Sequence, residues 1–118
     1  MDLITIRNKI EENLKLLRAT SRELKIRSQD KANAKGEYEK QLAIAMLRLR
    51  QGEPEFIESI SAEWQSVSGL ERIAKGLCYK ESIALDLAES AYKNAVIGIQ
   101  TVQVEINALQ SILRYLEE

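Results

Sequence analysis

The sequence predicts an all-α protein, a long antiparallel helical hairpin of the coiled-coil kind with a short connecting helix. Three observations favour this fold class. The only proline among the 118 residues, Pro54, lies near the midpoint and separates two long segments of helical periodicity. Apolar residues make up 45% of the chain, yet only six residues are aromatic, so the expected core is mainly aliphatic. The length suits one domain, and we expect a single helical domain over residues 1–118.

The first helix is expected over residues 3–50, because apolar side chains recur there at steps of three, four and seven. The apolar face consists of Leu3, Ile6, Ile10, Leu14, Leu17, Leu24, Tyr38, Leu42, Ala45 and Leu49. A polar stretch interrupts this face and leaves two alternatives. The helix either continues with the stretch solvated or breaks near Ser28–Gly36 into two shorter helices. Since one glycine costs only about 1 kcal/mol in a helix interior, we favour a continuous helix.

A short second helix is expected over residues 54–65. Proline suits the first helical position because it has no amide hydrogen to satisfy. The side chains of Phe56 and Trp64 share one face of this segment, and Glu55 and Glu58 make it acidic. These four residues at the hairpin tip are candidate contacts for a partner protein.

The last helix is expected over residues 69–116, starting at the capping-box pattern Ser68-x-x-Glu71. Its apolar residues recur at helical spacing as far as Leu116. Two long helices with a short connection imply antiparallel neighbours. In the register that follows, Leu3 faces Leu116, Ile10 faces Leu109, and Leu17 faces Val102.

A lone hairpin leaves apolar residues uncovered, and such surfaces usually mark an interface. The uncovered residues are Ile4, Leu16, Ile26, Ile44, Leu47, Ile83, Leu87, Ile97 and Val104. Two hairpins around a two-fold axis would bury them in a four-helix bundle. We therefore expect a homodimer or a stable partner protein. The alternative is a monomeric bundle in which the first helix folds back at its polar middle.

The residue types argue against an enzyme. The chain has no histidine, which removes the commonest general base and zinc ligand. No glycine-rich phosphate loop is present, and the carboxylates Glu81, Asp86 and Glu89 are spaced so that they do not share a narrow helix face. Cys78 follows Leu77 on the apolar stripe and is predicted to be a buried structural cysteine rather than a reactive thiol. We expect no catalytic residues, no metal and no cofactor.

The first fifty residues are basic and the remainder is acidic. Residues 1–50 carry 12 Lys/Arg and 7 Asp/Glu, whereas residues 51–118 carry 5 and 11. Halves of opposite charge attract each other when they fold side by side. No stretch of about 18 uncharged apolar residues occurs, so we expect no membrane association and a cytoplasmic location.

A basic ridge on the first helix supplies the alternative function. Lys15, Arg18, Arg22 and Lys25 follow one another at steps of three and four, and such a ridge can lie along a nucleic-acid backbone. No aromatic residue interleaves with them to stack on bases, and acidic residues interrupt the ridge. Nucleic-acid binding is therefore the second hypothesis, and the same four residues are candidate contacts for a protein.

Two segments, 36–54 and 88–95, carry a family resemblance. The first has the pattern Tyr-x-x-x-Leu-Ala followed by Leu-x-Leu-Arg-x-x-Gly-x-Pro, and the second has Ala-Glu-x-x-Tyr-Lys-x-Ala. Over roughly residues 36–112 the chain resembles small uncharacterised helical proteins of phages and prophages of Gram-positive bacteria. The resemblance brings no catalytic residues. It implies a phage-encoded accessory protein whose partner is unknown. We hypothesise that this factor binds and modulates a host or phage protein in replication, recombination or anti-defence, for example as an inhibitor of a host nuclease system. The first hypothesis is thus a non-enzymatic protein-interaction module in the host cytoplasm.

Overall fold

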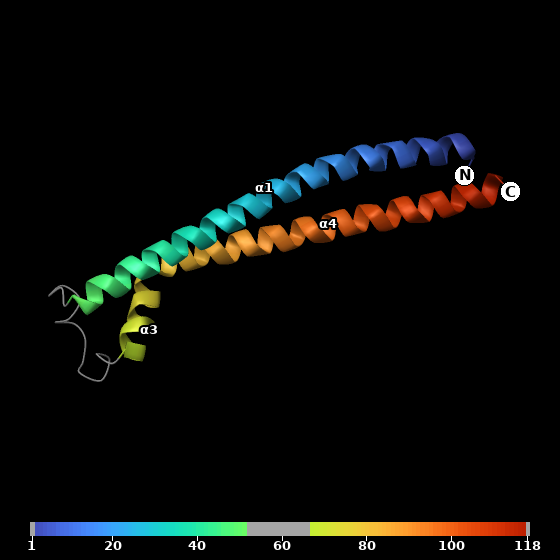
Figure 1. The fold of residues 1–118 in the computed structure, drawn as a ribbon. Helices are drawn as coiled ribbons and strands as arrows, with labels where there is room; N and C mark the ends of the chain where they lie inside the picture. The colour runs from blue at the N-terminus through green and yellow to red at the C-terminus, as the bar shows by residue number, and fades with distance from the viewer. Residues whose placement is uncertain (1, 52–66, 118) are drawn as a thin grey trace. The chain divides into compact units, whose positions relative to one another are not determined.

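The computed structural model describes residues 2–51 and 67–117, and these residues form helices without strands. Helix α1 spans Leu3–Arg50, α3 spans Val67–Leu77, and α4 spans Tyr79–Glu117 (Figure 1). The prediction of an all-α helical hairpin is confirmed. The predicted short helix over 54–65, with Phe56, Trp64, Glu55 and Glu58, lies outside the described residues.

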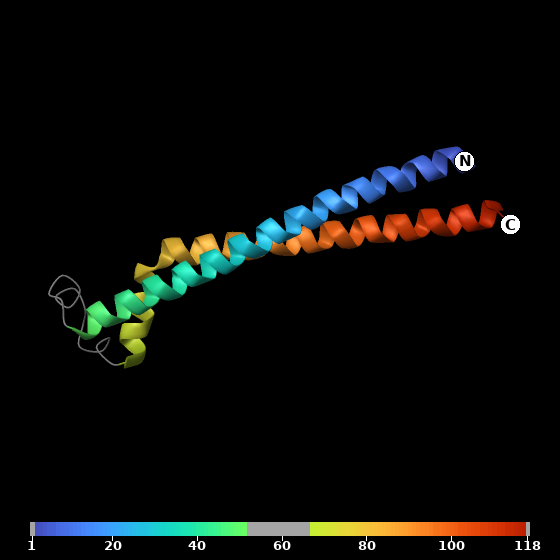
Figure 2. The same ribbon diagram turned by 45° about the horizontal axis from the view of Figure 1, so that its top comes forward.

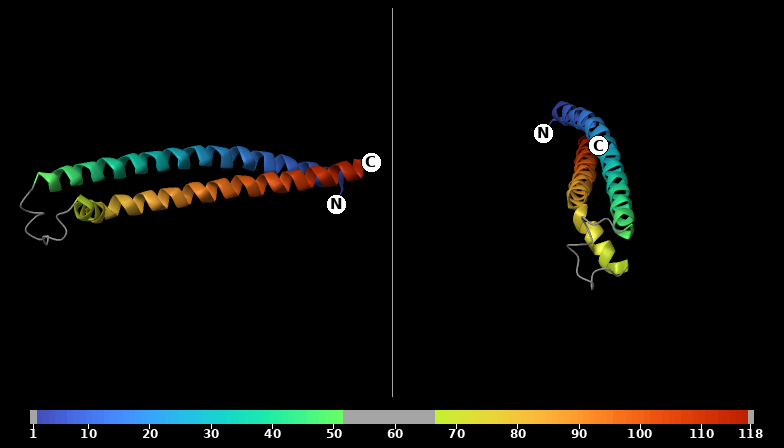
Figure 3. Two further views of the ribbon diagram at one scale, coloured as in Figure 1. Left: turned by 60° about the horizontal axis from the view of Figure 1, so that its bottom comes forward. Right: turned by 90° about the vertical axis from the view of Figure 1, so that its left-hand side faces the viewer.

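The hairpin contains two compact units. The terminal unit comprises Met1–Gln29 and Ser90–Glu118, and the inner unit comprises Asp30–Glu89. Within each unit a segment of α1 lies beside a segment of α4 that runs in the opposite direction (Figures 1 and 2). The start of α1 and the end of α4 lie at the same end of the terminal unit (Figure 3).

Helix α1 is continuous for 48 residues and passes through the polar middle without a break. The alternatives in which it breaks near Ser28–Gly36 or folds back there are therefore wrong. Alanine and lysine, which favour helices, recur through this stretch and outweigh the single glycine. Two side-chain bonds also link neighbouring turns: Arg27 Nε donates to Glu23 at 2.7 Å, and Gln41 Nε2 donates to Glu37 at 3.0 Å.

The faces of α1 and α4 that meet in each unit follow a coiled-coil repeat, with alternating steps of three and four residues. In α1 the buried or half-buried positions of this repeat are Ile6, Ile10, Asn13, Leu17, Thr20, Leu24, Arg27, Lys31, Ala34, Tyr38, Gln41 and Ala45. In α4 they are Glu81, Leu85, Ala88, Tyr92, Ala95, Ile99, Val102, Ile106, Leu109 and Leu113. Within the polar middle of α1, Arg27, Lys31 and Ala34 are thus half-buried in the seam, and the other residues of this stretch are exposed.

The terminal unit has the predicted register. Leu17 lines one shallow groove with Gln103, and Leu3 lines another with Leu116. Each pair lies within a residue or two of the expected pairing. At the same end Arg7 Nη2 donates to Glu117 Oε1 at 3.0 Å. Because both side chains of this ion pair are about half exposed, it contributes less than about 1 kcal/mol to the free energy of unfolding.

The buried side chains form a small core in each unit. Ile6, Val102, Ile106 and Leu109 are the buried residues of the terminal unit. In the inner unit the buried side chains are those of Leu49, Ala74 and Cys78. Within the described ranges no polar or charged residue is fully buried. The packing therefore rests on a few aliphatic side chains, as the composition predicts.

The prediction of one helix over 69–116 is wrong, because two helices, α3 and α4, occupy this range. They meet at Cys78, where the chain bends sharply (Figure 1). The amide of Cys78 bonds the carbonyl of Ala74 at 3.1 Å, and the amide of Ser82 bonds the carbonyl of Cys78 at 3.0 Å. Gly76, a weak helix former, lies two residues before the bend. The bend coincides with the burial of Ala74 and Cys78, and we attribute it to the packing of these two side chains in the inner unit.

Asp2 caps the first helix and makes its stability depend on pH. Asp2 Oδ1 accepts a hydrogen bond of 2.7 Å from the amide of Thr5, which is the N-cap geometry. This bond lowers the pKa of the Asp2 carboxyl below its usual 3.8. The carboxylate therefore stabilises the helix at pH above 3.8, and this contribution is lost as pH falls through the lowered value.

We expect the amides of the first turn of α1 to lose protection from hydrogen exchange as pH falls below about 3.8. An Asp2→Asn variant should keep the cap without this pH dependence, because the amide side chain also accepts the bond from Thr5 and does not titrate. Asp2→Ala should lack the protection at every pH. Equal protection in all three proteins would contradict the capping role. Exchange measured by NMR and corrected for the intrinsic rate at each pH distinguishes these results.

Candidate interaction surfaces

Helix α4 carries a second coiled-coil repeat on the side that faces away from α1. Starting at Ile83, alternating steps of four and three residues lead to Tyr115 without interruption. We call these ten positions the outer stripe. The outer stripe consists of Ile83, Leu87, Ser90, Asn94, Ile97, Thr101, Val104, Ala108, Ser111 and Tyr115. Every one of them is exposed.

The outer stripe is uncharged along its whole length, and all its apolar members except Ala108 are large. Leu87 and Val104 are each 67% exposed, and Ile97 is 58% exposed. Surface helices normally carry charged residues on the face opposite their core. An apolar heptad stripe opposite a packed one is instead typical of a helix with a neighbour on both sides. The outer stripe is therefore a candidate helix-binding surface.

Four members of the outer stripe are among the uncovered apolar residues predicted from the sequence, but the stripe as a whole was not predicted. Ser90, Asn94, Thr101 and Ala108 are small or polar, so a search for apolar residues alone passes over them. The signal was nevertheless present, since a search for charge-free positions at heptad spacing finds all ten residues. The corresponding residues of α1, such as Ile4 and Ile26, are exposed but separated by charged side chains and form no stripe.

The basic ridge lies on α1 in the terminal unit, with all four of its side chains exposed. Lys15, Arg18, Arg22 and Lys25 make no ion pair with any described residue. By contrast Arg27, which follows them, is half-buried in the seam and pairs with Glu23. The ridge is thus a solvated row of cations.

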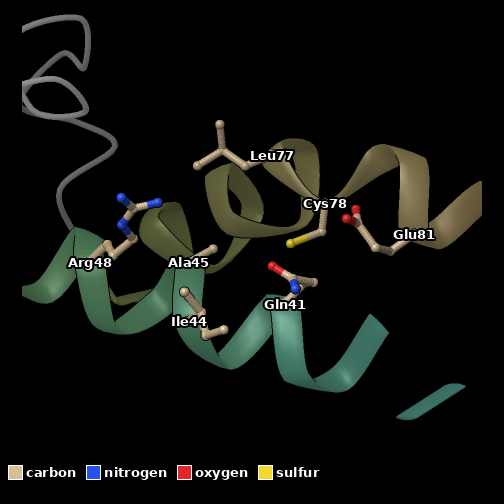
Figure 4. Close-up of a pocket in the computed structure, with 7 residues that line it drawn as sticks. All are labelled: Gln41, Ile44, Ala45, Arg48, Leu77, Cys78 and Glu81. Atoms are coloured by element: carbon tan, nitrogen blue, oxygen red, sulfur yellow. The ribbon is translucent and has the colours of Figure 1, made fainter. Parts of the chain in front are cut away.

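A third feature is a groove in the inner unit, beside the bend, with a volume of about 220 Å³. It is lined by Gln41, Ile44, Ala45, Arg48, Leu77, Cys78 and Glu81 (Figure 4). The sulfur of Cys78 points towards Gln41, and the thiol is only 4% exposed. Burial, followed by the nearby Glu81 carboxylate, raises the pKa of Cys78 above its usual 9.0. The thiolate is therefore disfavoured, in line with the predicted structural cysteine.

The described residues contain no cluster of three His, Cys, Asp or Glu side chains that could hold a metal ion. Glu81 is half-buried on the seam, whereas Asp86 is exposed. The carboxylates of the last long helix thus do not converge. None of the described helices is long and apolar enough to cross a bilayer.

Comparison with known proteins gives no family for this chain. No family model matches it, and no curated protein or solved structure does. Any function must therefore be inferred from the surfaces described above.

Proposed function

We propose that the protein is a non-enzymatic interaction module that binds a helix of another protein chain along the outer stripe of α4. The observation that carries this proposal is the continuous, charge-free, exposed heptad repeat from Ile83 to Tyr115. Helix-in-groove and coiled-coil recognition both use apolar residues at this spacing. At 1.5 Å per residue the stripe is about 48 Å long, enough to bind a helix of more than thirty residues.

The biological setting we propose follows the resemblance to phage and prophage proteins. In that setting the protein is a phage-encoded accessory factor in the host cytoplasm. It binds and modulates a host or phage protein of replication, recombination or anti-defence. Inhibitors that mimic DNA are usually strongly acidic, and the net charge of this chain is only −1. The protein would therefore modulate its partner through apolar helix contacts rather than through a DNA-like surface.

Nucleic-acid binding is the second candidate function, and the exposed, unpaired basic ridge favours it. If the four side chains of the ridge each neutralise one phosphate of a DNA duplex, the logarithm of affinity should fall with the logarithm of salt with a slope of about −3.6. The ridge lacks stacking aromatics, so no preference for single strands is expected.

One pair of variants separates the two functions. The stripe variant, Ile97→Glu with Val104→Glu, places charges on the outer stripe. The ridge variant, Arg18→Glu with Arg22→Glu, reverses two cations. All four side chains are exposed, so both variants should keep the helix content of the wild type, as measured by circular dichroism.

We expect immobilised wild-type protein and the ridge variant to retain the same protein from a lysate of phage-infected cells, and the stripe variant to lose it. Capture that survives in the stripe variant would contradict the proposed function. A fluorescent DNA duplex, titrated with salt, tests the alternative. Binding at low salt that disappears in the ridge variant would support nucleic-acid recognition.

A further inference from the structure

We infer that the outer stripe of α4 binds the outer stripe of a second copy of this chain, with the two α4 helices antiparallel about a two-fold axis near residue 99. This inference rests on the proposed function and names the partner of that same surface. Two features of α4 carry it: the symmetry of the stripe about its centre and the positions of the charges beside it.

The stripe is symmetric under reversal of the helix. Antiparallel coiled coils pair each residue with the one equally distant from the centre on the other side. With the axis at residue 99 all ten positions find a partner in the second copy. The pairs are Ile83 with Tyr115, Leu87 with Ser111, Ser90 with Ala108, Asn94 with Val104, and Ile97 with Thr101. None of these ten residues is charged.

Two side chains that flank the stripe also have complementary sizes. Ala84 and Ile112 flank it on the same side, and in the antiparallel pair the alanine of one copy lies opposite the isoleucine of the other. Gly98 lies opposite itself at the axis. No atom outside its own helix backbone lies within 4 Å of the position where a Cβ would stand on Gly98. A second helix can therefore approach closely there.

Charge complementarity selects the orientation and the register. On the other flank of the stripe, Asp86 of one copy faces Arg114 of the second, and the two-fold axis creates this pair twice. Both side chains are exposed, and neither makes an ion pair within the described chain. In a parallel dimer Asp86 would face Ala91 instead, and no flanking charges would pair.

Neighbouring registers lack this match. A shift of one heptad in one direction brings Lys93 opposite Arg114 of the second copy, which is repulsive. The shift in the other direction leaves Asp86 opposite Asn107 and shortens the contact. Only the register centred near residue 99 uses the whole stripe and pairs the charges.

Sedimentation equilibrium over a range of protein concentrations tests the dimer. We expect a reversible dimer whose dissociation constant rises about a hundredfold or more in the stripe variant Ile97→Glu with Val104→Glu, because each glutamate would be buried without a partner. The ridge variant Arg18→Glu with Arg22→Glu is the control and should dimerise like the wild type. A protein that stays monomeric, or a dimer that the stripe variant leaves intact, would overturn the inference.

A charge exchange tests the orientation. Asp86→Arg and Arg114→Asp should each weaken the dimer about tenfold, since each replaces two attractive pairs with two repulsive ones. The double exchange should restore most of the wild-type affinity. Absence of this restoration would overturn the antiparallel register, provided that circular dichroism shows unchanged helix content.

Cross-linking gives an independent measure of orientation in the Cys78→Ala background. Gln100 flanks the axis and lies opposite itself, whereas the two copies of Ser111 would be about 36 Å apart along the helices. A short bismaleimide should therefore link Gln100→Cys dimers and not Ser111→Cys dimers. Linking of both variants would indicate a parallel dimer and overturn the inference.

These outcomes are separable from those of the proposed function. If sedimentation shows only monomer while the lysate still yields a partner that depends on the outer stripe, the self-association fails and the interaction module stands. If the dimer forms as inferred but no other protein is retained, the modulating role fails and the antiparallel dimer stands.

Discussion

Truncation of Ile6 to alanine should destabilise the protein by about 2–5 kcal/mol. The side chain of Ile6 is completely buried in the terminal unit, where only three other residues in the described ranges are buried. Removing three carbon atoms there leaves a cavity that a two-helix unit has few side chains to fill. Urea unfolding, followed by circular dichroism at one fixed protein concentration, measures the change in free energy.

Ile4 offers a matched control two residues away on the same helix. Its side chain is 72% exposed, so Ile4→Ala should change the free energy of unfolding by no more than about 0.5 kcal/mol. The two variants share residue type, helix and distance from the chain end, and they differ in burial. If both variants destabilised the protein to a similar extent, or if neither did, the seam position of Ile6 would be contradicted.

Substitutions at Gly36 should change stability in opposite directions. Gly36→Ala should raise the free energy of unfolding by about 1 kcal/mol, because alanine is the better helix former and no atom beyond the local helix backbone lies within 4 Å of the added Cβ. Gly36→Pro should lower it by about 3 kcal/mol or more, because proline removes an amide hydrogen bond and clashes with the preceding turn.

This opposite response tests whether α1 is continuous through its polar middle. A chain that broke near residue 36 would accept proline with little loss and gain little from alanine. Lys35→Ala is a suitable control, because Lys35 is exposed in the same turn and already a good helix former. Unfolding in urea, with helix content checked before the titration, distinguishes the two cases.

The sequence predicted the path of α1 and the register of the terminal unit, because both depend on local rules. Helix propensity decides whether α1 continues through its polar middle. The spacing of large aliphatic residues decides which positions of α1 and α4 meet. The expected pairing of Leu17 with Val102 follows from that spacing alone. In the structure the ends of α1 carry an N-cap, Asp2, and a basic last turn that includes Arg50.

The bend at Cys78 could not be predicted in the same way, because it depends on tertiary burial rather than on local propensity. Residues 69–116 keep helical periodicity throughout, and Gly76 alone does not require an interruption. The chain bends where Ala74 and Cys78 are both buried in the inner unit with Leu49. A preference for the bent conformation appears only when the neighbouring helix is present to bury these side chains.

The surfaces were predicted in part. The exposed basic ridge follows from four cations at helical spacing, and the structure places all of them in solvent. The outer stripe was missed because half of its members are small or polar. The property that unites them is absence of charge, which becomes meaningful only when the opposite face of α4 is known to be occupied.

The pairing of α1 with α4 has a kinetic consequence. Ile44 and Leu77, which line the groove beside the bend, are 33 residues apart along the chain, whereas Arg7 and Glu117 at the free ends are 110 apart. By the logarithmic dependence of loop entropy on length, closing the ends first would cost about 1 kcal/mol more than closing near the bend. We therefore expect the two long helices to zip from the bend outward, so that the ends join last on folding and separate first on heating.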